Sequence, residues 1–311
     1  MKSHKIIAWL FTLIIIAPAT FAQQPTPTLS PAPSLTVTGP QPTIRTGELD
    51  SKLMAKKMPY SVVLPANYES EKETRFPVIY MLHGLGGNHK ITKLSSVKYT
   101  DKQRVILVFV EGGTGFYTDS STIASNKYES YVVNELVNEI DKAFRTIAER
   151  KGRAVAGVSM GGYGALKYGI KYPQLFSLAV SWSGAVNVTG FLEAKSLPLI
   201  PGLKAMLTTV FGDGKDRQVV TANDLFKLFA EYPEDKLKDL PFFYLDCGTE
   251  DELGLFKPNR DLSEIMINRK IPHEYREFPG GHGVSPANQF PDLYQLSERI
   301  FKKQEAASRA K

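Results

Sequence analysis

Cysteine and histidine are both scarce in this sequence of 311 residues. The single cysteine, Cys247, excludes an internal disulfide framework and a cysteine-rich zinc site. The five histidines are spread along the chain and leave little basis for a histidine metal cluster, so we expect no metal.

Charge of one sign is not concentrated anywhere in the chain. The formal net charge is +6, but lysines and arginines are interleaved with acidic residues, and we find no basic stripe and no nucleic-acid motif. We therefore expect no nucleic-acid partner. Hydrophobic residues make up 42% and charged residues 23%, which excludes disordered, collagen-like and coiled-coil chains.

The first 22 residues predict a secretory signal peptide. Lys2 and Lys5 precede an apolar run from Ile6 to Ala17, which is shorter than the roughly 20 residues that a bilayer span needs. Cleavage after Ala22 would give a secreted or periplasmic protein without stable membrane insertion. An uncleaved membrane anchor is the alternative.

Residues 23–43 carry six of the twenty prolines and no charge, which predicts an extended linker. We expect a folded domain over 44–303 and a flexible tail over 304–311. Within the domain, strand and helix patterns alternate, which favours an α/β fold with a mostly parallel central sheet and helices on both faces. Strands are expected at 61–64, 76–82, 104–110, 154–158, 178–181, 242–245 and 273–278, and helices at 128–150, 160–172, 262–268 and 291–302.

The sharpest motif is a G-x-S-x-G run from Gly157 to Gly161. It follows an apolar strand and opens a helix, as a nucleophile elbow requires, and its glycines permit a tight turn. Ser159 is therefore the predicted nucleophile. Because the motif alone is weak, a glycine-rich turn with a bystander serine is the alternative.

A serine nucleophile needs a base, and in this architecture an acid and then a histidine follow it along the chain. Asp251, in the turn after the penultimate strand, is the predicted acid, with Asp246 and Glu250 as alternatives. His282, in a glycine-rich loop after the last strand, is the predicted base. His273 lies in or before that strand and is the poorer candidate.

An acyl-transfer site also needs two donors for the developing oxyanion. The backbone N–H of Met160, at the start of a helix, is one predicted donor. The other is the N–H of Leu85, in the glycine-rich loop after strand 76–82, with Gly86 as the second choice. A plain strand-ending loop is the alternative, and His83 is expected to be structural.

The apolar segment 186–240 separates two predicted strands. It could cap the site and hold an acyl or aryl group, or it could form a helix pair packed on the domain. Tyr117 and Trp182 are further candidates for the wall of the pocket.

Together these segments resemble the esterase D-like family of α/β-hydrolases. That family includes secreted acetyl-xylan and feruloyl esterases, tributyrin esterases, S-formylglutathione hydrolases and mycolyltransferases. The resemblance covers nearly the whole chain from about Leu53 onward. It is carried by PVIYMLHGLGG (77–87), GFYTDS (115–120), YESYVVNEL (128–136), AGVSMGGYGAL (156–166), SWSGA (181–185), CGTEDEL (247–253) and PHEYREFPGGH (272–282).

The resemblance implies an α/β-hydrolase fold, a Ser159, Asp251 and His282 triad, oxyanion amides at Leu85 and Met160, and no metal or organic cofactor. It implies a secreted serine carboxylesterase that hydrolyses short acyl or aryl esters through an acyl-enzyme. The substrate would be a small molecule or an ester carried by a polysaccharide.

Three alternatives remain beside this function. One is acyl transfer to a sugar or lipid alcohol, and one is a thioesterase like the S-formylglutathione hydrolases. Those hydrolases usually carry a cysteine-bearing loop where this chain has residues 85–87, and they work in the cytoplasm. The third alternative is a binding protein without catalysis on the same scaffold.

Overall fold

The computed structural model describes residues 41–90, 103–194, 200–213, 217–282 and 286–309. The predicted signal peptide (1–22) and all but the last residues of the predicted linker (23–43) lie outside the described residues. The described residues belong to one compact unit, Pro40–Lys311.

Among the described residues, eight strands form a single sheet in the order β1-β2-β4-β3-β5-β6-β7-β8. All neighbouring strands from β4 to β8 in this order pair in parallel. At the other edge, β2 pairs antiparallel both with β4 and with β1. The strands are β1 (Thr43–Ser51), β2 (Lys56–Leu64), β3 (Val78–Leu82), β4 (Ile106–Val110), β5 (Arg153–Val158), β6 (Leu178–Trp182), β7 (Phe242–Gly248) and β8 (His273–Phe278).

The central strands are buried on both faces, and this is why they are apolar at nearly every position. In β3, Val78, Tyr80 and Leu82 pack in one core, while Ile79 and Met81 pack in a second core on the other face. The sheet is therefore the middle layer of three.

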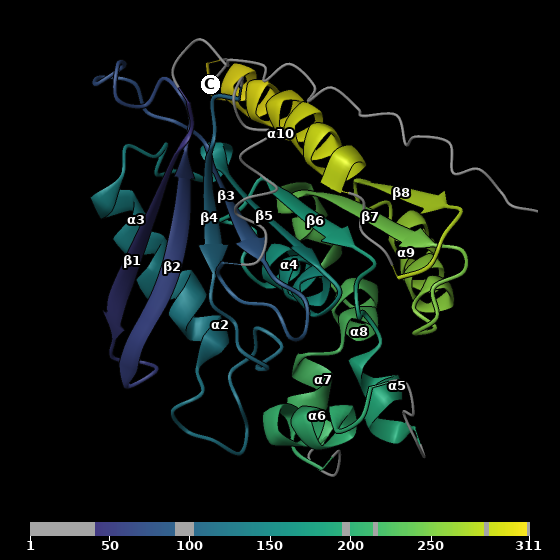
Figure 1. The fold of residues 1–311 in the computed structure, drawn as a ribbon. Helices are drawn as coiled ribbons and strands as arrows, with labels where there is room; N and C mark the ends of the chain where they lie inside the picture. The colour runs from purple at the N-terminus through teal and green to yellow at the C-terminus, as the bar shows by residue number, and fades with distance from the viewer. Residues whose placement is uncertain (1–40, 91–102, 195–199, 214–216, 283–285, 310–311) are drawn as a thin grey trace, which may run out of the picture. The chain divides into compact units, whose positions relative to one another are not determined.

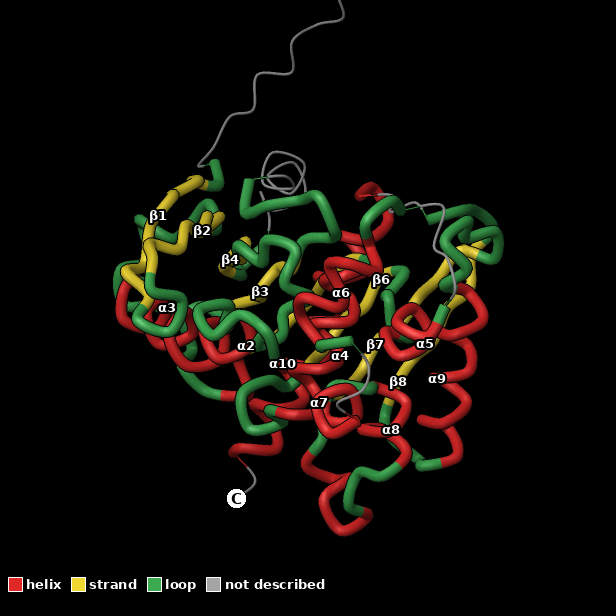
Figure 2. Tube along the Cα trace, turned by 90° about the horizontal axis from the view of Figure 1, so that it is seen from below, coloured by secondary structure: helices red, strands yellow, loops and turns green. Residues whose placement is uncertain are grey.

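Helices cover both faces of the sheet. The first core takes residues from η1, α3, α4, α8 and α9, whereas the second core takes Phe290, Leu293, Tyr294 and Ile300 from α10. Figure 1 shows α10 on its own across the sheet, while α5, α6, α7 and α8 gather beyond the ends to which the arrows of β3 and β4 point. The same four helices lie close together in Figure 2. The predicted α/β architecture with helices on both faces is confirmed.

The helices have the following bounds. They are α2 (Tyr128–Ser130), the π-helical η1 (Tyr131–Leu136), α3 (Val137–Ala143), η2 (Arg150–Gly152), α4 (Met160–Lys171), α5 (Val188–Glu193), α6 (Leu203–Phe211), α7 (Arg217–Ala222), α8 (Leu225–Ala230), η3 (Glu234–Asp239), α9 (Phe256–Asn268) and α10 (Pro286–Arg309).

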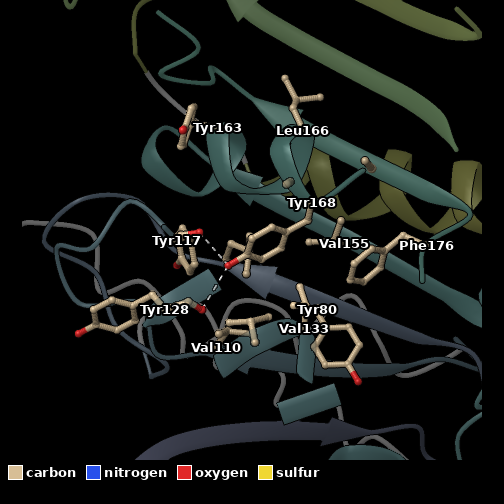
Figure 3. Packing of buried hydrophobic residues seen from close by; sticks show 14 of the residues in the cluster. Tyr80, Val110, Tyr117, Tyr128, Val133, Val155, Tyr163, Leu166, Tyr168 and Phe176 are labelled. Atoms are coloured by element: carbon tan, nitrogen blue, oxygen red, sulfur yellow. Dashed lines mark hydrogen bonds between the residues drawn. The ribbon is translucent and has the colours of Figure 1, made fainter. Parts of the chain in front are cut away.

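A tyrosine layer joins α4 to the loop that follows β4. The hydroxyl of Tyr168 donates to the carbonyl oxygen of Tyr117 at 3.0 Å, and the two rings meet edge to face, with centroids 6.5 Å apart (Figure 3). The hydroxyl of Tyr117 in turn donates to the carbonyl of His83 at 3.1 Å. This layer ties the loop after β3 to the helix that follows the elbow.

The predicted helix over 128–150 is too long at its C-terminal end. Helix α3 ends at Ala143, and Phe144 is extended, with φ −131° and ψ 156°. The amide of Phe76 donates to the carbonyl of Arg145, and the amide of Ile147 donates to Phe76, both at 2.8 Å. This strand-like pairing with a distant segment replaces the last helical turns.

Two other expectations differ from the structure at the ends of the domain. Strand β1 was not predicted, and it occupies the sheet edge beside β2. Helix α10 begins before Pro291 and continues to Arg309, so it extends into the region predicted as a flexible tail, 304–311.

Candidate active site

The predicted site residues follow the carboxyl ends of parallel strands. Leu85 follows β3, Ser159 follows β5, Asp251 follows β7 and His282 follows β8. Because parallel strands end at the same edge of a sheet, the fold brings these four segments to one edge.

Ser159 occupies the sharp turn between β5 and α4. Its backbone lies at φ 56° and ψ −115°, a sparsely populated region for any residue with a side chain. The surrounding chain holds this conformation, because the amide of Ser159 donates to Trp182 at 2.9 Å and its carbonyl accepts from Tyr163 and Ala185 at 3.1 and 3.0 Å. A strained, well-anchored residue at such a turn has the geometry of a nucleophile elbow.

The glycines of the motif are required by close backbone approach. A Cβ atom at Gly157 would lie 2.3 Å from the carbonyl oxygen of Gly161, and one at Gly161 would lie 2.1 Å from that of Leu82. Neither position has room for a side chain. The G-x-S-x-G pattern is therefore fixed by the packing of α4 against β3 and β5.

Asp251 and His282 are in direct contact. The Oδ2 atom of Asp251 lies 2.8 Å from Nδ1 of His282, and its Oδ1 atom accepts from the amides of Leu253 and Leu255 at 2.9 and 3.4 Å. Burial alone would raise the pKa of Asp251, but the hydrogen bonds from His282 and the two amides outweigh it and hold the pKa below its ordinary value. The carboxyl group is thus kept ionised beside the imidazole.

The same carboxylate has one further partner. The thiol of Cys247 lies 3.6 Å from Oδ2 of Asp251, and burial raises its pKa to about 12. Cys247 therefore stays protonated and donates to the oxygen that also faces His282.

The contact with Asp251 determines the role of each imidazole nitrogen. Nδ1 of His282 donates to the carboxylate, which leaves Nε2 as the proton acceptor. In the described part of the chain, neither Nε2 of His282 nor Oγ of Ser159 forms a hydrogen bond. In enzyme sites without a bound substrate, the hydrogen bond between a base and its nucleophile often forms only when substrate binds.

The alternative acids and base lie elsewhere. Asp246 is within β7, where it accepts from the amide of Ser183 at 3.2 Å, and burial raises its pKa to about 7. Glu250 is exposed. Nε2 of His273 lies 3.0 Å from the hydroxyl of Ser263. None of these side chains is hydrogen-bonded to His282.

The two predicted oxyanion donors lie in the wall of the same pocket as Ser159. Met160 is the first residue of α4, so its amide has no partner within the helix. Leu85 precedes Gly86, whose φ of +79° is the value that a type II turn needs at its third position, and the amide of Gly87 closes this turn on Gly84 at 3.0 Å.

The pocket beside Ser159 is small and apolar. Its cavity volume is about 90 Å³, and Ser159 has the only polar side chain among the described residues that line it. The lining residues are Leu85, Phe116, Ser159, Met160, Ala185, Phe191, Ile200, Leu203, Leu253 and Leu255.

Segment 186–240 contributes directly to this pocket. Phe191, Ile200 and Leu203 belong to it and form part of the wall, while Leu207 and Phe211 of α6 are buried in the first core. The segment thus borders the site and also packs on the domain.

Tyr117 and Trp182 do not line the pocket, contrary to expectation. Tyr117 is fully buried, and its neighbour Phe116 forms the wall instead. Trp182 packs against Phe290 of α10, with ring centroids 6.3 Å apart, because its side chain points to the opposite face of the sheet.

The described residues contain neither a membrane-spanning helix nor a cluster of metal ligands. No helix there is both long and apolar enough to cross a membrane. No group of three or more His, Cys, Asp or Glu side chains there is placed to hold a metal ion.

The chain is similar to known esterases. Residues 51–290 match the family described as "Putative esterase". The chain is 31% identical over 262 residues to Esterase Rv1288 of Mycobacterium tuberculosis (strain ATCC 25618 / H37Rv), covering 76% of this chain but only 54% of that protein. It thus spans about half the length of that relative.

Two further similarities extend over most of both chains. The acetyl esterase of Caldicellulosiruptor saccharolyticus is 26% identical over 241 residues, covering 75% of this chain and 89% of that protein. A solved structure of a ferulic acid esterase superposes with a TM-score of 0.68 at 26% identity, covering 85% of this chain and 99% of that chain.

Proposed function

Because this chain belongs to that esterase family, we propose that it is a serine carboxylesterase that hydrolyses short acyl or aryl esters through an acyl-enzyme. The observation that carries the proposal is the 2.8 Å contact between Asp251 and His282 at the sheet edge where Ser159 forms a strained elbow. A non-catalytic scaffold has no need for either feature.

The proposed first step is acylation. Nε2 of His282 takes the proton of Ser159 Oγ while Oγ attacks the acyl carbon of the ester. The amides of Leu85 and Met160 hold the negative charge that develops on the acyl oxygen. The ionised Asp251 stabilises the imidazolium, and the leaving alcohol takes its proton from Nε2.

Deacylation repeats the same steps with water. Nε2 of His282 removes a proton from a water molecule as its oxygen attacks the acyl carbon, and the proton then returns to Oγ of Ser159. The free acid leaves and the enzyme is regenerated. Every proton transfer uses one nitrogen atom, so the orientation that Asp251 gives to the ring matters in both halves of the reaction.

The pocket supports a short acyl group. Its volume of about 90 Å³ is smaller than the roughly 150 Å³ of a cavity that admits benzene. Among the described residues of its wall, only Ser159 offers a side-chain hydrogen bond. The similarity to an acetyl esterase and to a ferulic acid esterase supports the range from acetyl to aryl acyl groups. An apolar pocket of this size favours the alkyl end of that range.

The setting of the enzyme is also part of the proposal. The amino-terminal pattern of residues 1–22 supports export to the periplasm or the medium. Esters carried by polysaccharides are the substrates that we propose for an exported esterase of this kind.

The test is the replacement of the proposed nucleophile. Ser159→Ala should lower turnover of p-nitrophenyl acetate by about a million-fold and abolish labelling by a fluorophosphonate probe, while thermal unfolding stays unchanged. Ser70→Ala, which removes an exposed hydroxyl, is the matched control and should leave both readouts intact. Substantial turnover or labelling of the Ser159→Ala protein would refute the serine mechanism.

A further inference from the structure

Glu111 links the two ends of the loop that carries the proposed Leu85 donor. It follows β4 directly, and its Oε2 atom lies 2.7 Å from Nδ1 of His89 and accepts from the His89 amide at 3.3 Å. Its Oε1 atom accepts from the amide of Gly113 at 3.1 Å and lies 3.8 Å from Nε2 of His83. One carboxylate thus touches both the beginning and the end of the loop 83–89.

The beginning of the loop is fixed through His83. Nε2 of His83 accepts from the amide of Gly112 at 3.0 Å, so its proton must be on Nδ1. Nδ1 then donates to the carbonyl oxygen of Gly84 at 2.8 Å, and the same oxygen accepts from the amide of Gly87 at 3.0 Å. The Gly84 carbonyl is therefore held by two donors.

The orientation of the Gly84 carbonyl also determines that of the next amide. The carbonyl of Gly84 and the N–H of Leu85 belong to one planar trans peptide, so they point in opposite directions. The two hydrogen bonds on Gly84 therefore aim the Leu85 amide away from His83. A shift of His83 or of Gly112 would rotate this peptide and move the donor.

Glu111 is suited to hold this arrangement. Burial by itself would raise its pKa, but the hydrogen bonds from the His89 ring and from the amides of Gly113 and His89 hold the pKa below its ordinary value. The side chains of His83 and His89 are nearly buried, at 3% and 10% exposure. The carboxylate is thus a permanent, partly desolvated acceptor between the two histidines.

We propose that Glu111 is a positioning residue that sets the direction of the Leu85 amide in the oxyanion hole, an inference that rests on the proposed esterase function. Glu111 is not among the described residues that line the pocket beside Ser159. It acts by fixing His89 at one end of the loop. At the other end it accepts from the amide of Gly113, which holds the preceding residue, Gly112, in place to donate to Nε2 of His83.

The central test is Glu111→Gln, which keeps the size of the side chain but replaces one acceptor oxygen by an amide NH2, so that it cannot accept both from His89 and from the Gly113 amide. Because the donor acts in the transition state, kcat for p-nitrophenyl acetate should fall roughly ten- to a hundredfold while KM changes less than about twofold. The affinity of a trifluoromethyl ketone, which mimics the oxyanion, should fall in parallel with kcat. Replacement of a residue that only stabilises the fold would not lower kcat and the affinity of the oxyanion mimic together while KM stays nearly unchanged.

Two matched pairs of variants separate positioning from folding. Glu71 forms an equally short carboxylate pair with Arg104 at 2.6 Å, far from this loop, so Glu71→Gln should leave kcat unchanged. His89→Asn retains a side-chain N–H close to the position of Nδ1 and should keep most of the activity, whereas His89→Leu should match Glu111→Gln. The His89 pair decides the question if Glu111→Gln does not fold.

The outcomes also separate this inference from the proposed function. If Ser159→Ala is inactive but Glu111→Gln and His89→Leu keep the wild-type kcat, the positioning role is wrong and the esterase mechanism stands. A rise in KM with unchanged kcat would overturn the positioning role as well. If Ser159→Ala retains activity, the proposed function itself is wrong.

Discussion

Lys167 and Glu129 form an ion pair in the interior of the protein. The lysine Nζ lies 2.8 Å from Oε2 of the glutamate, with the two side chains 0% and 6% exposed. Lys171 and the hydroxyl of Tyr172 approach the other oxygen of Glu129, at 2.5 and 2.7 Å. The pair joins α4, which follows the elbow, to α2.

Removing one partner of this pair should destabilise the fold strongly. Glu129→Gln leaves the buried ammonium of Lys167 without a counter-charge, which should lower the free energy of unfolding by about 3–5 kcal/mol. Urea unfolding measures the loss. Asp261→Asn breaks the exposed pair with Lys257 and should cost less than about 1 kcal/mol. Equal losses for the two variants would contradict a dominant role of burial.

The ion pair between Lys167 and Glu129 should make the stability of the fold depend on pH. Burial alone would raise the pKa of Glu129, but Lys167 and Lys171 outweigh it and hold the pKa at about 2, against 4.5 for an unperturbed carboxyl. A carboxyl with a lowered native pKa stabilises the fold above its unfolded pKa and loses that contribution as pH falls towards the native pKa. The free energy of unfolding should therefore fall by about 3 kcal/mol as the pH is lowered from 5 to 2. Urea unfolding across this range should show a flatter profile for Glu129→Gln.

Asp251→Asn tests which carboxylate orients the imidazole. An amide at this position can stabilise the wrong tautomer of His282, so kcat should fall by about ten-thousandfold while the protein stays folded. Turnover of p-nitrophenyl acetate and circular dichroism measure the two effects. Glu250→Gln, one residue away in an exposed position, should be close to wild type. If kcat fell for Glu250→Gln and not for Asp251→Asn, Glu250 would be the acid instead of Asp251.

Phe191→Ala tests whether α5 limits the acyl chain. Phe191 lines the pocket and is only partly buried, so its truncation should enlarge the cavity without collapsing the core. The ratio of kcat/KM for p-nitrophenyl hexanoate to that for acetate should rise roughly tenfold. Phe226→Ala, on α8 and outside the pocket wall, is the control. An unchanged chain-length profile for Phe191→Ala would show that the acyl group binds elsewhere.

The sequence predicted the elbow segment well because its signals are local. An apolar strand, a G-x-S-x-G run and a helix stopped near Pro173 can be recognised without knowledge of the rest of the fold, and the structure has β5 and α4 within one residue of the expected bounds. The contact between Asp251 and His282 was anticipated from chain order. It depends only on two neighbouring parallel strands ending at the same edge.

Other features depend on distant partners and could not be predicted in this way. Strand β1 carries Arg45, Glu48 and Asp50, and it forms because β2 offers an open edge. Phe116 lines the pocket while Tyr117 is buried, and both residues have positive φ values, 48° and 49°, which no sequence pattern indicates. The link from Glu111 to the loop 83–89 joins segments that follow two different strands, β4 and β3, and nothing in the local sequence signals it.

The backbone conformation of Ser159 is energetically unfavourable for the fold. A side chain at φ 56° and ψ −115° is disfavoured by about 1–3 kcal/mol, and glycine would be free of most of that penalty. Stability of the fold alone would therefore favour glycine over serine at this position. The proposed nucleophile thus lies at a locally destabilised turn, and the hydrogen bonds of its backbone with Trp182, Tyr163 and Ala185 must offset this strain.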